Sequence, residues 1–165
     1  MPTSNIPERA FRDAMGSFAT GVCVLGAKRR DGAAIGMTVN SFTSVSLDPP
    51  LILVCLGMES PRSRAIIDSG RFSVSILASD QRALSNHFAQ QGEGFVPETG
   101  WREGQNGAPV MDKAAAVIEC AIETTHSSGD HLIVIGLVTH IESDPGREPL
   151  LYFRGGYRLL DGEVG

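Results

Sequence analysis

The sequence has few of the features that mark exported, membrane-spanning or zinc-binding proteins. Its three cysteines, Cys23, Cys55 and Cys120, are far apart and form no CxxC pair, so we expect free thiols in a reducing cytoplasm. The longest apolar run covers residues 51–58, whereas a membrane helix needs roughly 18 residues. No basic segment followed by an apolar stretch opens the sequence, so no signal peptide is expected.

Positive charge is also scarce. Lys28 and Lys113 are the only lysines, and 14 basic residues face 19 acidic ones, for a net charge of −5. This balance argues against a nucleic-acid surface. The sequence contains no HExxH, GxSxG, Walker A or GxGxxG motif, so metalloprotease, serine-hydrolase, P-loop and Rossmann interpretations have no support. With 42% hydrophobic residues, residues 1–165 predict a single folded domain with a core over about 8–160.

Glycine, by contrast, is abundant, and most of the 19 glycines lie between short apolar runs. This pattern is typical of a β protein rich in turns. Residues 51–56 predict a strand buried on both faces, and the alternation over 72–77 predicts a half-buried one. Two hairpins are expected, 21–27 with 33–39 and 116–126 with 131–143, and further short strands at 150–153 and 157–160.

Helical spacing is limited to three segments, 7–18, 60–70 and 79–92. Ser60 and Ser79 are the expected N-caps of the last two. In the third segment one stripe is formed by Ala83, Leu84, His87 and Phe88. The connection over 92–114 has no clear period, and we expect it to be functional or to cover something. The fold class is therefore mainly β with short helices, as an antiparallel barrel or sandwich.

The segment 55–66 is a candidate anion site. Ser60 caps a helix whose first turn carries Arg62 and Arg64, and cations there oppose the helix dipole unless an anion is bound. Phosphate is the obvious anion. The alternative is that both arginines pair with Glu59 or Asp68, and the residues leave both interpretations open.

The segment 36–50 carries many small polar side chains. They could bind a flat ligand rich in heteroatoms, or they could form the polar outer face of an edge strand in which Asn40 and Ser41 make a bend. Its polar residues are Thr38, Asn40, Ser41, Thr43, Ser44 and Ser46.

Histidines are the usual acid–base candidates, but His126 and His131 flank a hairpin turn, where surface histidines are common. No histidine pair has metal-ligand spacing, so no metal site is expected. Cys55 lies in an apolar strand and is expected to be a small core residue rather than a nucleophile.

Five segments in one order carry a stronger signal than any of them alone. They are FRDAMGSFATGVCVL, GMTVNSFTSVSLDPPLILVCL, SNHFA, GDHLIVIGLV and PLLYFRGGY. Over roughly residues 8–160 this order resembles the flavin reductase-like family, and within it the short reductase components of two-component flavin-dependent monooxygenases. The resemblance implies an FMN-binding split β-barrel of Greek-key type and a homodimer.

The resemblance also implies two sets of site residues. The flavin set, with the polar strand at the ring edge and the helix start at the phosphate, is Thr38, Val39, Asn40, Ser41, Phe42, Ser44, Val45, Cys55, Leu56, Ser60, Arg62, His87, Phe88 and Ala89. The nicotinamide set is Ser17, Phe18, Thr20, His131, Tyr152, Arg154, Gly155 and Tyr157. The family's phosphate loop often carries Lys where this chain has Glu59 and then arginines, so FMN and FAD both remain candidates.

The activity implied by the resemblance is hydride transfer from NADH or NADPH to FMN or FAD. The cofactors supply the chemistry, so no catalytic acid or base is expected, and His131 is assigned to positioning the nicotinamide nucleotide. Reduced flavin would then diffuse to a separate oxygenase. The alternatives are a flavin-binding electron carrier or store without free-flavin turnover, and a split-barrel oxidase of a phosphorylated small molecule such as a pyridoxal precursor.

Overall fold

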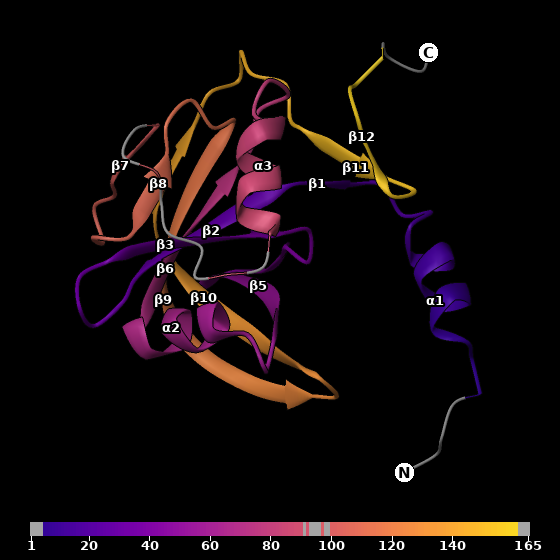
Figure 1. Ribbon diagram of the computed structural model, residues 1–165. Helices are drawn as coiled ribbons and strands as arrows, with labels where there is room; N and C mark the ends of the chain where they lie inside the picture. The colour runs from indigo at the N-terminus through magenta and orange to yellow at the C-terminus, as the bar shows by residue number, and fades with distance from the viewer. Residues whose placement is uncertain (1–4, 91, 93–96, 98–99, 162–165) are drawn as a thin grey trace.

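A seven-stranded antiparallel sheet forms the body of the protein (Figure 1). The computed structural model describes residues 5–90, 92, 97 and 100–161. Along the sheet the strand order is β3-β2-β6-β9-β10-β5-β4. These strands are β2 (Cys23–Lys28), β3 (Ala34–Val39), β4 (Thr43–Leu47), β5 (Pro50–Gly57), β6 (Arg71–Ile76), β9 (Ala116–Ser128) and β10 (His131–Ser143). The predicted mainly β fold and both predicted hairpins, β2–β3 and β9–β10, are confirmed.

Two smaller sheets and three helices complete the described part of the chain. The order β1-β11-β12 forms one small sheet, and β7 pairs with β8 in the other. The bounds are β1 (Thr20–Gly21), β11 (Leu151–Phe153), β12 (Gly156–Arg158), β7 (Trp101–Glu103) and β8 (Pro109–Met111). The helices are α1 (Glu8–Met15), α2 (Pro61–Ser69) and α3 (Arg82–Ala89). None of the helices in these ranges is long and apolar enough to cross a membrane.

The main hydrophobic core lies between the large sheet and α2. Leu25, Val54, Phe72 and Val134 are fully buried in it, and Ile66 brings α2 onto the sheet. α2 starts and ends as predicted, because the Ser60 side chain accepts a hydrogen bond from the Ser63 N–H at 3.5 Å and Gly70 closes the helix in the left-handed conformation.

The prediction that β6 is half-buried is wrong. Its polar side chains Ser73 and Ser75 are as completely buried as Phe72 and Val74. The β7–β8 hairpin covers them: the Ser73 hydroxyl donates to the Pro109 carbonyl, and Ser75 Oγ accepts a hydrogen bond from the Met111 N–H at 2.9 Å. In the predicted connection over 92–114, residues 93–96, 98 and 99 lie outside the described residues. Its part over 101–111 covers the sheet, one of the two predicted roles, and forms two strands that the sequence does not predict.

The predicted start of α3 is also wrong. The helix begins at Arg82 rather than after Ser79, because the Gln81 side chain holds the preceding turn in a non-helical conformation. Its Oε1 accepts a hydrogen bond from the Ala78 N–H at 2.9 Å, and its amide donates to the Asp112 carbonyl at 2.7 Å. The buried face of the helix is consequently rotated from the predicted stripe. Ser85 and Phe88 are buried, whereas Ala83 and His87 are exposed.

α1 and the β11–β12 hairpin stand beside the body of the chain rather than on it (Figure 1). α1 has no buried residue, and Phe11, Met15 and Phe18 expose 57%, 56% and 77% of their surface. The apolar face predicted for this helix therefore exists but is not covered by the described part of its own chain.

Candidate functional site

The polar segment over 36–50 is divided by a bend at residues 40–42, between the end of β3 and the start of β4. The Ser41 hydroxyl fixes this bend to β5. It donates to the Cys55 carbonyl at 3.0 Å and accepts from the Cys55 N–H at 3.0 Å. The bend that the sequence left open at Asn40 and Ser41 is therefore present, and it divides the polar residues between two strands.

The bend leaves main-chain donors available. Residues 40–42 belong to no strand ladder, and their N–H groups make none of the turn or loop hydrogen bonds found in the described ranges. Since backbone N–H groups seek acceptors, this edge fits a ring system rich in carbonyl oxygens and ring nitrogens. Asn40 is exposed beside these groups.

The neighbouring residues of the predicted flavin set divide into core and surface positions. Val39 and Phe42 pack against the main core, and the Leu56 side chain is fully buried in it. Ser44 and Val45 are exposed on β4. Leu56 can therefore approach a ligand only through its backbone.

Arg62 binds α3 to the sheet. Its guanidinium donates to the Phe88 carbonyl at 2.7 Å and to the Gln90 carbonyl at 2.9 Å, with a longer contact of 3.4 Å to the Gly36 carbonyl. Burial lowers the pKa of this guanidinium below its ordinary value. A cation at the end of α3 also complements the helix dipole. The phosphate role assigned to Arg62 stays a prediction.

The alternative was that Arg62 and Arg64 pair with Glu59 or Asp68. Within the described residues, neither arginine forms an ion pair with either carboxylate. Asp68 instead lies 3.7 Å from Arg30. Arg62 and Arg64 line a cavity of about 990 Å³ together with Ser60. The helix start and a large cavity thus lie together, as the anion-site interpretation requires.

The α3 part of the flavin set is anchored from two directions. The Thr38 hydroxyl donates to the Ser85 carbonyl at 2.7 Å, and the Phe88 ring is fully buried against Gly36. His87 contacts the Phe88 ring edge-on, with 4.8 Å between ring centroids. His87 and Ala89 are exposed. The helix therefore offers His87 and Ala89 side chains to a ligand, but not the Phe88 ring.

Most of the predicted nicotinamide set gathers around the β1-β11-β12 sheet. Thr20 pairs with Tyr152 across β1 and β11, and the Tyr152 and Tyr157 rings meet edge-on at 5.5 Å. The Tyr157 O–H donates to Asn86 Oδ1 at 2.8 Å and lies 2.8 Å from Ser85 Oγ, so this sheet is attached to α3.

Some polar groups of the β1-β11-β12 sheet already form hydrogen bonds within the chain. The N–H of Arg154 donates to the Gly16 carbonyl at 2.9 Å, next to the exposed Ser17 and Phe18. Gly155 forms the turn of the hairpin with a φ of 76°. Thr20 Oγ1 is buried and has no hydrogen-bond partner in the described part of the chain.

His131 lies elsewhere. It begins β10 at the tip of the β9–β10 hairpin, where it pairs with Gly57 of β5. Figure 1 places that tip at the lower end of the molecule and β11–β12 at the upper end. His131 Nδ1 is 2.6 Å from Asp130 Oδ1. This hydrogen bond and the charge of His131 hold the pKa of the Asp130 carboxyl below its ordinary value. A single chain therefore does not bring His131 to Tyr152 and Tyr157.

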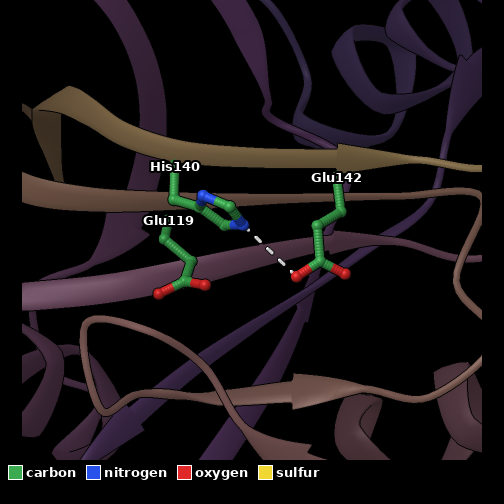
Figure 2. Close-up of side chains that lie close together, drawn as sticks. All are labelled: Glu119, His140 and Glu142. Carbon is green, nitrogen blue, oxygen red and sulfur yellow. Dashed lines mark hydrogen bonds and ion pairs between the residues drawn. The ribbon is translucent and has the colours of Figure 1, made fainter.

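A second cluster, formed by Glu119, His140 and Glu142, was missed by the sequence reasoning (Figure 2). One potential ligand atom from each lies within 4.8 Å of the others. Glu119 accepts hydrogen bonds from the N–H groups of Gln105 at 3.0 Å and Asn106 at 2.6 Å. The cluster thus fastens the β7–β8 hairpin to the sheet.

The predicted β9–β10 hairpin could have indicated this cluster, because its strand pairing places the three side chains together. His140 and Glu142 are two residues apart on β10, so they share a face, and His140 pairs with Glu119 on β9. Glu142 also forms an ion pair with Arg102 of β7, and its Oε1 lies 3.3 Å from His140 Nε2.

Comparisons with known proteins agree with this geometry. The family described as "Flavin reductase like domain" matches residues 15–161. "Probable flavin reductase" of Rhizobium meliloti is 46% identical over 149 residues, which are 90% of this chain and 48% of that protein. "FMN reductase (NADH) SmoA" of Agrobacterium fabrum is 41% identical over 90% of this chain and 83% of its own length. The chain thus spans about half of the first relative and most of the second.

Among solved structures, "NADH:FAD oxidoreductase SgcE6" of Streptomyces globisporus superimposes with a TM-score of 0.89 at 34% identity, covering 99% of this chain and 100% of that one. The predicted antiparallel split β-barrel is therefore confirmed. Since the family match covers residues 15–161 of the 165, the chain belongs to the flavin reductase-like family.

Proposed function

We propose that the protein is a flavin reductase that uses NADH or NADPH to reduce FMN or FAD. The observation that carries the proposal is its 41% identity to an NADH-dependent FMN reductase over 83% of that protein's length. With both substrates bound, the chemistry is hydride transfer from C4 of the nicotinamide to N5 of the flavin, which needs no proton transfer by the protein.

The chain's own residues bind and orient the two substrates. The N–H groups of residues 40–42 and the hydroxyl-rich strands around them hold the ring edge, and Ser60 with Arg62 holds the phosphate. Orientation of two bound reactants can lower the barrier by several kcal/mol, so a reductase can work with this set of groups alone.

The test is steady-state oxidation of NADH by the purified protein with excess FMN or FAD. NADH consumption should depend on added flavin and saturate with it. A protein that binds flavin but oxidises NADH only to one equivalent per bound flavin would be the electron carrier instead. Oxygen-dependent conversion of a phosphorylated pyridoxal precursor would identify the oxidase alternative.

We infer that the reduced flavin serves a separate oxygenase and reaches it by diffusion. Several similar proteins are named as reductase subunits of flavin-dependent monooxygenases, which supports the inference. An unrelated flavin reductase giving the same rate of reduced flavin should then support the oxygenase equally well. A strict requirement for this chain would show direct transfer.

We also infer a homodimer. The exposed apolar side chains Phe11, Met15 and Phe18 of the N-terminal segment, with Leu159 and Leu160 after β12, form surface that a second copy would cover. Within one chain, His131 lies far from Tyr152 and Tyr157. A second copy could bring its own His131 to these two side chains.

Analytical ultracentrifugation tests the homodimer. The double variant Phe11→Ser with Met15→Ser should raise the dimer dissociation constant at least about tenfold, because two apolar anchors are lost. Arg9→Ala, on the same helix but outside this apolar set, should leave it unchanged. A wild-type protein that sediments as a monomer at all concentrations would overturn the inference.

The role proposed for His131 is to position the nicotinamide nucleotide. His131→Ala should raise the KM for NADH several-fold, the loss expected for one hydrogen bond, with a smaller change in the KM for flavin. Equal changes in both would remove this assignment.

Single-domain organisation over residues 1–165, with its core at about 8–160, stays a prediction, and so does a cytoplasmic location. The location is supported by the thiols of Cys23, Cys55 and Cys120, all free in the structure. Cys23 and Cys120 are buried, which raises the pKa of each to about 12 and keeps both thiols protonated and unreactive.

A further inference from the structure

The cavity at the start of α2 is larger than a single phosphate requires. It has a volume of about 990 Å³ and extends from Ser60 and Arg62 to Arg29 and Arg30 in the turn between β2 and β3. The half-buried Ala65 provides an apolar part of its lining. A pocket of this size accommodates a nucleotide rather than an inorganic ion.

The lining of the cavity carries four arginines against three carboxylates, those of Asp31, Glu59 and Asp68. The four arginines come from two segments of the chain. A second cavity of about 320 Å³, whose lining also includes Arg29 and Arg30, adds two further cations, of which Lys28 is already paired with Glu103. The basic residues are Arg29, Arg30, Arg62 and Arg64 in the first cavity, with Lys28 and Arg71 in the second.

Acidic residues neutralise this charge only in part. Asp31 lies 3.2 Å from Arg29, and Asp68 lies 3.7 Å from Arg30, whose side chain is 84% exposed. Arg64 makes no side-chain hydrogen bond or ion pair within the described ranges. Exposed pairs of this kind contribute little to stability, so Arg30 can turn to an anion at small cost.

The position of the cavity beside the proposed flavin site indicates which ligand would fill the cavity. The ring edge is assigned to residues 40–42 and the first phosphate to Ser60, and the cavity continues from there to Arg30. FMN ends at its single phosphate, whereas FAD continues with a second phosphate, a ribose and an adenine. The names of similar proteins do not choose between the two, since one reduces FMN and another FAD.

We propose that this cavity binds the adenylate half of FAD, and that the protein prefers FAD to FMN. The proposal rests on the flavin reductase function proposed above. Arg30 and Arg64 bind the second phosphate, because guanidinium groups form strong charge-assisted hydrogen bonds to phosphate oxygens. The half-buried Ala65 side chain lies against the adenine.

The experiment measures the Kd values of oxidised FAD and FMN by isothermal titration calorimetry, without any nicotinamide nucleotide. Wild-type protein should bind FAD at least about tenfold more tightly than FMN. The double variant Arg30→Ala with Arg64→Ala should raise the Kd for FAD roughly tenfold and the Kd for FMN less than about twofold. Both side chains are on the surface, so the variant is expected to fold, and its circular dichroism spectrum checks this.

Two controls sharpen the result. Arg9→Ala removes one exposed positive charge on α1, outside the cavity, and should change neither Kd. Arg30→Lys keeps the charge and should retain part of the preference for FAD, because lysine keeps the attraction but loses the paired donors.

Three outcomes would overturn the proposal. Equal losses for FAD and FMN would place both arginines at the phosphate that the two flavins share. Unchanged Kd values would show that the arginines bind neither. An unchanged Kd for FAD with an increased KM for NADH or NADPH would assign the cavity to the nicotinamide nucleotide. Failure of NADH oxidation is a separate result, since it would defeat the proposed activity while the binding preference could still hold.

Discussion

The two ends of the β9–β10 hairpin share one pair of strands but differ in what covers them. At one end β7–β8 lies over the sheet, and Glu119 and Cys120 are completely buried. At the other end residues 124–131 are exposed, and the hairpin tip extends beyond the body of the molecule (Figure 1). One hairpin therefore combines a covered end and an open end.

At the covered end, polar groups of the large sheet form hydrogen bonds with the β7–β8 hairpin. The Asn106 side-chain amide donates to the Phe72 carbonyl at 3.1 Å and to the Cys120 carbonyl at 3.3 Å. The Thr139 hydroxyl donates to the Glu119 carbonyl at 3.0 Å. At the open end, the hairpin is connected to the rest of the molecule by the pairing of β10 with β5 and by the hydrogen bond from the Met58 N–H to the Asp130 carbonyl. The comparison predicts that changes at the covered end affect stability, and that changes at the open end affect ligands or partners.

The largest effect is expected for Glu119→Ala. The variant leaves the N–H groups of Gln105 and Asn106 without the acceptor that the completely buried Glu119 side chain provides, so it should lower the free energy of unfolding by about 3 kcal/mol. Urea unfolding measures the loss.

The control is Glu142→Ala in the same cluster (Figure 2). Its side chain is 44% exposed, so losing its ion pair with Arg102 and its contact with His140 should cost less than about 1 kcal/mol. Similar losses in both variants would show that the burial of Glu119 does not determine the cost of losing its contacts.

A second, smaller effect is expected for Gly26→Ala on β2. A Cβ atom there would lie 2.0 Å from the Pro109 carbonyl oxygen, so the methyl group must push β8 away from the sheet. The expected loss is about 2 kcal/mol, typical of overpacking. Gly21→Ala is the matched control, because its Cβ would meet nothing within 4 Å. A neutral Gly26→Ala variant would show that β7–β8 contributes little to stability.

At the open end, Gly129→Ala tests the turn alone. Gly129 has a φ of 62°, a conformation that an alanine adopts only with strain, and its Cβ would meet no other atom. The expected loss is about 1 kcal/mol. Gly57→Ala, on the neighbouring strand with open space around its Cβ, should be neutral. A loss from Gly129→Ala as large as that from Gly26→Ala would mean that the open tip is as tightly coupled to the core as the covered end.

This division explains which parts of the fold the sequence could predict. The β9–β10 hairpin was predicted because its turn and its apolar runs are local signals, and α2 because Ser60 and Gly70 mark its ends. β7 and β8 were not predicted, since strands of three residues carry almost no period and are held by side chains far along the chain. Ser73, for example, binds Pro109 across 36 residues.

In the candidate site, too, local features could be predicted from the sequence and contacts between distant residues could not. The polar residues of the bend could be found, but the role of Ser41 could not, because it depends on the register that brings Cys55 beside it. Arg62 was assigned from its place in the first turn of α2. The structure adds contacts to Phe88 and Gln90, 26 and 28 residues away, which no local pattern contains.

The smallest effect concerns the charge of the open tip. A hydrogen bond from His131, and then its positive charge, lower the pKa of the Asp130 carboxyl. The stabilisation from this pair is therefore present above the carboxyl's unfolded pKa and is lost as the pH falls through its lowered, folded pKa. His131→Ala should return the pKa of Asp130 toward its ordinary value in an NMR titration, with no measurable change in the free energy of unfolding, because the carboxylate is fully exposed.

His131→Gln separates the two causes, since glutamine retains a donor but carries no charge. Because the hydrogen bond is the larger cause, the pKa of Asp130 should rise only part of the way toward the value found in His131→Ala. Identical pKa values in the two variants would show that charge alone holds the carboxyl in its ionised form. In that case added salt should produce the same rise in the wild-type protein, because screening weakens a charge interaction between exposed groups more than it weakens a direct hydrogen bond.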